Sequence, residues 1–107
     1  MVQYRDPGSV VFDAVIENPG GPGAYVTFPF DTVEVFGVRA RVPVKARFDD
    51  RVAYTGSLAP YGGQHRLGVR KDIQQSLGKT HGDTVRVELV LDTERADVAG
   101  DDKSGRT

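Results

Sequence analysis

Apolar and polar residues alternate most regularly in two stretches of the chain, residues 38–48 and 85–92. A period of two is typical of a strand that buries one face and exposes the other, so both stretches predict strands. Their apolar positions are Val38, Ala40, Val42, Val44, Ala46, Phe48, Val85, Val87, Leu89 and Leu91. Shorter stretches of strand composition lie at residues 10–17, 24–30, 52–58 and 65–69. The chain is therefore predicted to be mainly β.

A very short helix, residues 32–36, is predicted immediately before the first long strand. The side chain of Asp31 can cap the helix N-terminus, and Glu34 stands three residues later, where a capping-box partner would lie. Gly37 follows the helix and can adopt the left-handed conformation in which many helices end.

The second long strand is preceded by a similar pattern. Val69, Ile73 and Leu77 recur at i, i+4 and i+8, which predicts an apolar stripe on a two-turn helix, and Gly78 ends that helix. Residues 82–83, Gly-Asp, then predict a tight turn. Because the unit of short helix, glycine and strand occurs twice, we expect a small pseudo-twofold β-barrel capped by two short helices.

The length of 107 residues suits one domain, which would bury roughly 65% of the surface that the unfolded chain exposes. We expect an N-terminal extension at residues 1–9, the barrel domain at residues 10–94 and a flexible C-terminal tail at residues 95–107, where the apolar pattern ends. The aromatic residues expected in the core are Tyr25, Phe28, Phe30 and Phe36.

The formal net charge of −1 neither attracts nor excludes nucleic acid, so polyanion binding would need local patterning. The absence of cysteine excludes disulfides and thiolate chemistry. No apolar run is long enough to span a bilayer, and the N-terminus lacks a signal-peptide pattern. These features predict a cytoplasmic protein without membrane contact.

Several short motifs together resemble a known family. In chain order they are Phe28-Pro29-Phe30-Asp31, Phe36-Gly37, Val42-Pro43-Val44, Ser57-Leu58 with Pro60, Gly62-Gly63 with His65, Leu77-Gly78 and Gly82-Asp83-Thr84-Val85. Their order and spacing are similar to those of small bacterial and archaeal proteins classed as a domain of unknown function, over about residues 11–92. The resemblance implies a double-split β-barrel akin to the AbrB, MazE and MraZ barrels. Relatives are sometimes fused to a YdeI-like, bacteriocin-protection domain, and the resemblance carries over no catalytic residue.

Four basic residues are predicted on the polar face of the first long strand: Arg39, Arg41, Lys45 and Arg47. Side chains at i and i+2 on a strand stand about 6.5–7 Å apart, close to the phosphate spacing of a nucleic-acid strand, so this row could follow a polyanion. The plainer interpretation is a solvated face on which these cations pair across strands with Asp13, Glu88 or Asp92.

The candidate small-ligand site is the predicted loop made by Tyr61, Gly62, Gly63, His65 and Arg66. Glycines let a backbone approach a ligand closely, and an aromatic ring, an imidazole and a guanidinium follow within a few residues. The plainer interpretation is a turn in which Gly62 and Gly63 supply positive φ angles and His65 begins a strand.

Other chemistry finds little support in the sequence. His65 and His81 are too far apart for a compact metal motif, so we expect no metal and no cofactor. Ser57 lacks the Gly-x-Ser-x-Gly context of an activated nucleophile. The glycine-rich residues 20–23 precede a strand and lack the Lys-Ser/Thr of a phosphate-binding loop. No residue is assigned a catalytic role.

Three hypotheses follow from these patterns. The first is a non-catalytic barrel that binds a ligand or partner, with a homodimer as one form, since an open barrel leaves strand edges that can pair. The second is an AbrB-like nucleic-acid-binding module that uses the basic strand face. The third is an enzyme with its site at the loop of residues 61–66. Size-exclusion chromatography and DNA binding over a salt series would separate the first two.

Overall fold

The computed structural model describes residues 3–20 and 23–96. Its strands are β1 (Val10–Val15), β2 (Ala24–Phe28), β3 (Val42–Phe48), β4 (Val52–Tyr61), β5 (Gln64–Val69) and β6 (Thr84–Leu91). Its helices are α1 (Thr32–Phe36) and α2 (Lys71–Leu77). Most of the predicted C-terminal tail, from residue 97 onward, lies outside the described residues.

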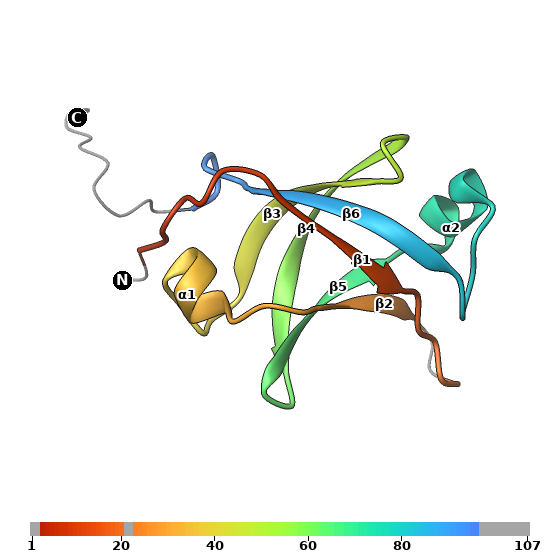
Figure 1. Cartoon of the computed structure of the whole chain (residues 1–107), viewed down its shortest axis with the longest axis horizontal. Helices are drawn as coiled ribbons and strands as arrows, with labels where there is room; N and C mark the ends of the chain where they lie inside the picture. Colours follow the sequence, from red (N-terminus) through yellow and green to blue (C-terminus); the bar gives the residue numbers. More distant parts are fainter. Residues whose placement is uncertain (1–2, 21–22, 97–107) are drawn as a thin grey trace.

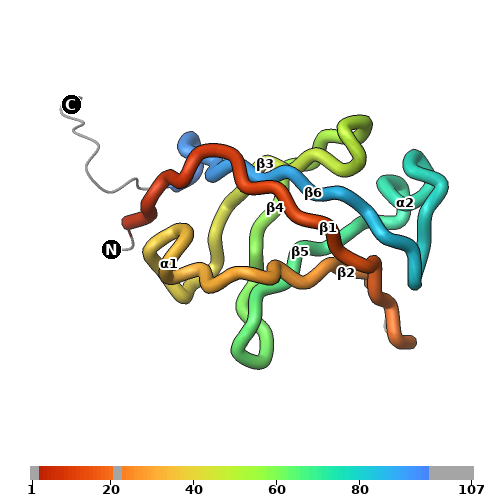
Figure 2. Tube along the Cα trace, in the orientation of Figure 1, coloured from red at the N-terminus to blue at the C-terminus, as the bar shows by residue number. Residues whose placement is uncertain are grey.

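The six strands form one antiparallel sheet in the order β1-β6-β3-β4-β5-β2. The sheet curls into a barrel, with α1 and α2 at opposite ends of the long axis (Figure 1). A single backbone bridge, Glu17 to Tyr25, connects the two outer strands. Beyond that bridge β1 and β2 separate toward the end where α1 lies (Figure 2). The barrel is therefore closed at one end of this seam and open at the other, which makes it nearly closed. The predicted mainly β barrel with two short helices is confirmed.

The strand pairing has an internal twofold pattern. The elements β1, β2, α1 and β3 can be exchanged, in that order, with β4, β5, α2 and β6. Every neighbouring pair of strands then maps onto a neighbouring pair. The pairs β2–β5 and β3–β6 map onto themselves, while β1–β6 maps onto β4–β3. The repeated unit is therefore β-β-α-β, and it contains the helix, glycine and strand seen twice in the sequence.

Alternate residues of the strands fill one interior. The fully buried large side chains are Phe28, Phe36, Phe48, Ile16, Leu58, Leu67, Leu89, Val26, Val42, Val44, Val69 and Val85. Burial of an aliphatic or aromatic side chain contributes about 1.5–3 kcal/mol, so this set supplies the main driving force for folding. Two of the expected core aromatics differ: Phe30 is 47% exposed, and Tyr25 is half-buried on the outer face of β2. Phe30 comes after β2 ends, so the strand period no longer sets its direction.

Both helices end as their sequences predict. The Asp31 carboxylate accepts a hydrogen bond from the Val33 backbone N–H at 2.8 Å, and Gly37 follows α1 with φ +81°. Gly78 follows α2 with φ +69°, and its N–H donates to backbone carbonyls of the last turn. Of the three residues predicted to form the apolar stripe of the second helix, Val69 belongs to β5 and not to α2.

The first long strand is shorter than its alternation predicts, because β3 begins at Val42 and residues 38–41 are irregular. The carbonyl oxygens of Arg39, Ala40 and Arg41 accept hydrogen bonds from side chains instead of from a neighbouring strand. His65 Nε2 lies 3.0 Å from the first two, and the Tyr4 hydroxyl donates to the third at 2.7 Å. Backbone groups satisfied in this way need no strand partner.

The β4–β5 connection is tighter than predicted. Tyr61 and Gln64 are paired, so the strands are joined by the two residues Gly62 and Gly63, with φ +58° and +86°. This is the backbone of a two-residue hairpin turn, which favours glycine.

No helix among the described residues is long and apolar enough to cross a membrane.

Candidate ligand-binding site

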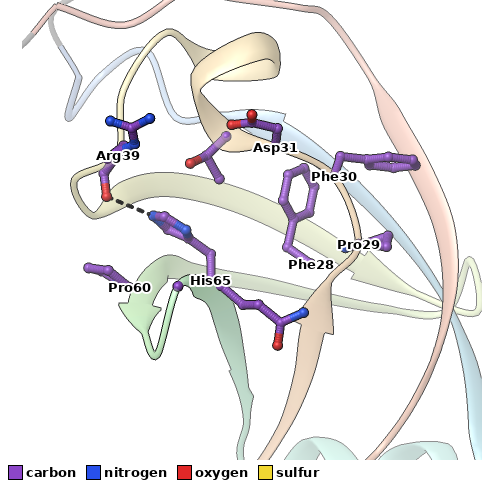
Figure 3. A pocket seen from close by; sticks show the side chains of 10 residues that line it. Phe28, Pro29, Phe30, Asp31, Arg39, Pro60 and His65 are labelled. Carbon is purple, nitrogen blue, oxygen red and sulfur yellow. Dashed lines mark hydrogen bonds between the residues drawn. The ribbon is translucent and has the colours of Figure 1, made fainter.

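A cavity of about 540 Å³ opens between the start of α1 and the β4–β5 hairpin. Its lining residues are Phe28, Pro29, Phe30, Asp31, Thr32, Arg39, Pro60, Gly63, Gln64 and His65. They come from three parts of the chain, which the pairing of β2 with β5 brings together at Phe28 and His65. Figure 3 shows the His65 ring directed at the Arg39 carbonyl and Phe28 rising toward the segment that carries Asp31.

His65 is the central polar group of this cavity. The residue is only 8% exposed, and its Nε2 lies 3.0 Å from the carbonyl oxygens of Arg39 and Ala40. A carbonyl oxygen can only accept, so Nε2 carries the proton and donates to both. In the neutral imidazole Nδ1 then keeps its lone pair, and it makes no hydrogen bond with the described residues. The fold thus fixes the tautomer of His65 and leaves one acceptor on the ring.

Aromatic and charged groups surround the imidazole. Phe28 and Phe30 pack edge to face with their ring centroids 5.5 Å apart, which gives the cavity an aromatic wall. Thr32 is 4% exposed and brings a hydroxyl, while Asp31 and Arg39 are exposed at the rim. The site combines a cation, a carboxylate, a fixed imidazole and an apolar surface, a composition suited to binding a small amphiphilic molecule.

The twofold pattern places a second cavity of about 540 Å³ at the other end of the barrel, beside α2. In the exchange His65 corresponds to Ala24 and Phe28 to Val69, because the pairs Phe28–His65 and Val69–Ala24 map onto each other. Arg39 corresponds to Thr80, since each lies two residues after the glycine that ends its helix. The imidazole and the aromatic wall therefore belong to the α1 cavity alone.

The residues predicted in the 61–66 loop do not converge on one site. His65 and Arg66 are neighbours on β5, so their side chains point to opposite faces of the sheet. His65 faces the cavity, whereas the Arg66 guanidinium carbon lies over two rings on the outer face, 4.0 Å from the centroid of Tyr25 and 3.8 Å from that of Tyr61. Tyr61 and Arg66 therefore lie together, but His65 lies on the other face of the sheet, so the three groups do not form one site.

The four predicted basic residues also do not form one row. Only Lys45 and Arg47 lie on β3; Arg39 lines the cavity and Arg41 is exposed before the strand begins. Lys45 Nζ lies 3.8 Å from Glu94 Oε1, and Arg47 stands opposite Glu88 in the β3–β6 register. Arg47 thus has a cross-strand neighbour of opposite charge on a solvated face, but it makes no ion pair with Glu88 or with any other described residue, so the pairing of the plainer interpretation is not formed.

Three aspartates with lowered pKa values lie outside the cavity. For Asp92, hydrogen bonding by Arg95 lowers the pKa more than burial raises it. For Asp49, burial raises the pKa, but Lys79, whose Nζ lies 2.6 Å from Asp49 Oδ2, and the Arg86 backbone N–H together outweigh it.

For Asp72, hydrogen bonding by Arg70 is the largest cause of the lowered pKa. All three carboxylates are engaged in ion pairs: Asp49 pairs with the distant Lys79, whereas Asp72 and Asp92 pair with arginines two and three residues away. No cluster of three or more His, Cys, Asp or Glu side chains suited to a metal ion occurs in the part of the chain that the structure describes.

Sequence reasoning missed most of the cavity lining. The sequence predicts Asp31 as a helix cap and Phe28 as a core residue, and both predictions are confirmed, yet both residues also line the cavity. The sequence gives no indication that Thr32 lines a cavity. The closeness of the capping Asp31 to Phe28 and Phe30 in the sequence is a signal for this site. The register of β2 against β5 is still needed to place His65 beside them.

A family model described as a domain of unknown function, DUF1905, matches residues 12–89 of the chain. The match begins within β1, ends within β6 and includes the whole cavity lining. No curated protein matches the chain.

Proposed function

The chain belongs to the DUF1905 family of domains of unknown function, and we propose that it is a non-catalytic binding module for a small amphiphilic oxyanion held in the α1 cavity. The observation that carries the proposal is the buried His65, whose Nε2 is committed to two backbone carbonyls and whose Nδ1 has no partner among the described residues. A ring nitrogen that opens to a cavity and that the described residues leave unpaired is suited to accept a hydrogen bond from a ligand.

The proposed ligand carries three features that match the cavity. A carboxylate or similar oxyanion pairs with the Arg39 guanidinium, which makes no ion pair with the described residues. An N–H or O–H group donates to His65 Nδ1. An apolar body packs against Phe30, which is exposed next to the buried Phe28, and the volume of about 540 Å³ falls in the usual range of roughly 300–1,000 Å³ for small-molecule sites.

A binding role is favoured over an enzymatic one because the imidazole has no orienting acid. His65 is held by neutral carbonyl oxygens, whereas a general base in a triad is oriented by a carboxylate. Thr32 is the one serine, threonine or lysine of the cavity lining, and its hydroxyl makes no hydrogen bond to a base among the described residues.

The test is an NMR titration of the labelled protein with a panel of small aromatic and aliphatic hydroxy- and amino-carboxylates. We expect perturbed signals from Thr32 and the His65 ring, with weakened binding in Arg39→Gln. Arg41→Gln is the matched control, because Arg41 is exposed in the same segment but does not line the cavity. Equal affinity in the two variants, or a panel that leaves the cavity signals unmoved, would contradict the proposal.

A further inference from the structure

Arg66 lies between two tyrosine rings on the outside of the barrel. Its guanidinium carbon is 4.0 Å from the ring centroid of Tyr25 on β2 and 3.8 Å from that of Tyr61 at the end of β4. Both distances are well within the range of a cation–π contact. The three side chains form a stack across three adjacent strands, which we call the Tyr25–Arg66–Tyr61 stack.

The stack leaves the hydrogen-bonding edge of Arg66 free. A guanidinium donates only in its plane, and the guanidinium carbon of Arg66 lies within cation–π distance of both rings. Arg66 makes no side-chain hydrogen bond and no ion pair with the residues that the structure describes. Its donors are thus pre-oriented, and a planar fork of this kind matches the oxygens of a phosphate or carboxylate.

The surroundings of the stack favour an anion. The segments β2, β4 and β5 contain no Asp or Glu, although the chain has 15 such residues, and Arg66 is their only Lys or Arg. The outward neighbours of Arg66 on the sheet are small: Thr27 and Ala59 stand opposite it, and Gly68 lies two residues along β5. On these three strands an approaching oxyanion therefore meets no competing carboxylate, and the nearest acid in the register is Glu17, which is bridged to Tyr25 on the side of β2 away from Arg66.

Tyr61 adds a second recognition element. It is 60% exposed although one side of its ring is occupied by Arg66, so the ring can still receive a planar partner. Aromatic side chains of this kind stack on nucleobases without regard to base identity.

We propose that the Tyr25–Arg66–Tyr61 stack is a second binding site, on the opposite face of β5 from the cavity, for a nucleotide unit. The phosphate binds the free edge of Arg66, and the base stacks on Tyr61. The same unit can come from a free mononucleotide or from the end of a single strand.

The experiment compares three probes by NMR titration: inorganic phosphate, adenosine monophosphate and a 5′-phosphorylated pentathymidylate. We expect adenosine monophosphate to shift the Tyr25, Tyr61 and Arg66 side-chain signals, and Arg66→Lys to weaken its binding about tenfold, because an ammonium cannot reproduce the planar fork. Arg70→Lys is the matched control: Arg70 also lies over a tyrosine, Tyr54, at 5.3 Å, but it is already paired with Asp72.

Two further variants separate the parts of the proposal. Tyr61→Ala should reduce adenosine monophosphate binding to the level of inorganic phosphate, and Arg41→Gln, at an exposed residue outside both sites, should leave it unchanged. Tighter binding of the pentanucleotide, with a steeper salt dependence, would identify a strand as the source; equal binding would identify the free nucleotide. The proposal is overturned if millimolar adenosine monophosphate leaves the stack signals unmoved, or if Arg66→Lys and Arg70→Lys bind it equally with both variants folded.

Discussion

Arg95 Nε donates to Asp92 Oδ2 at 2.6 Å, and this pair closes the C-terminal end of the barrel. The Asp92 side chain is 3% exposed, while Arg95 also donates to the carbonyl oxygens of Val44 and Gly56. The predicted tail therefore contains at its start a residue that connects β3 and β4 to the end of β6. Removal of Arg95 would leave a buried carboxylate without its cation.

We expect Arg95→Ala to lower the free energy of unfolding by about 1–3 kcal/mol, because charged hydrogen bonds to Asp92 are lost and the Arg95 side chain is partly exposed. Urea denaturation followed by circular dichroism measures the change. Arg47→Ala is the control, since Arg47 is exposed on β3 and makes no ion pair with the described residues. A loss of the same size in both variants would show that Arg95 has no special role.

Stability should also depend on pH through Asp92 and Asp49. Both have pKa values lowered in the folded state, so their ionised forms stabilise the fold above the ordinary carboxyl pKa, and that stability is lost as the pH falls through the folded values. We expect the free energy of unfolding to begin to fall below about pH 5 and to keep falling as the pH drops beneath the ordinary carboxyl pKa. In Asp92→Asn the protein should be less stable at neutral pH and the decline shallower; an unchanged slope would exclude Asp92 as a source.

Local signals in the sequence predict the elements of this fold well. The bounds of α1 follow from Asp31 and Gly37, which act within one turn of the helix, and the burial of Val85 and Leu89 follows from strict alternation. The start of β3 could not be predicted in this way. The alternation continues back to Val38, but side chains from distant parts of the chain take the carbonyls before Val42.

The site depends even more on non-local contacts. The sequence singles out His65 and Arg66 together, and only the strand geometry shows that one faces the cavity and the other the Tyr25–Arg66–Tyr61 stack. Asp31 and Thr32 reach the cavity because β2 pairs with β5 in one particular register. A shift of one residue in that register would turn His65 to the outer face.

The cap of α1 provides a further prediction. Asp31 accepts a hydrogen bond from the Val33 N–H, whereas Glu34 makes no side-chain bond with the described residues, so only half of the predicted capping box is present. Asp31→Ala should lower the free energy of unfolding by about 0.5–2 kcal/mol. Glu34→Gln should change it by less than about 0.5 kcal/mol. Chemical denaturation of both variants tests this, and a large effect at Glu34 would indicate a reciprocal bond to the cap.

Two glycines on neighbouring strands give the sharpest test of packing. A Cβ on Gly56 would lie 2.5 Å from Cε2 of Tyr54, whose ring packs near Phe48, whereas a Cβ on Gly68 would have nothing within 4 Å. We expect Gly56→Ala to cost about 1–3 kcal/mol, since Tyr54 must move from its place, and Gly68→Ala to stay within about 0.5 kcal/mol. Thermal and urea unfolding measure both. Equal stability of the two variants would mean that the Tyr54 ring is free to swing away and that its contact with Gly56 adds nothing to the barrel.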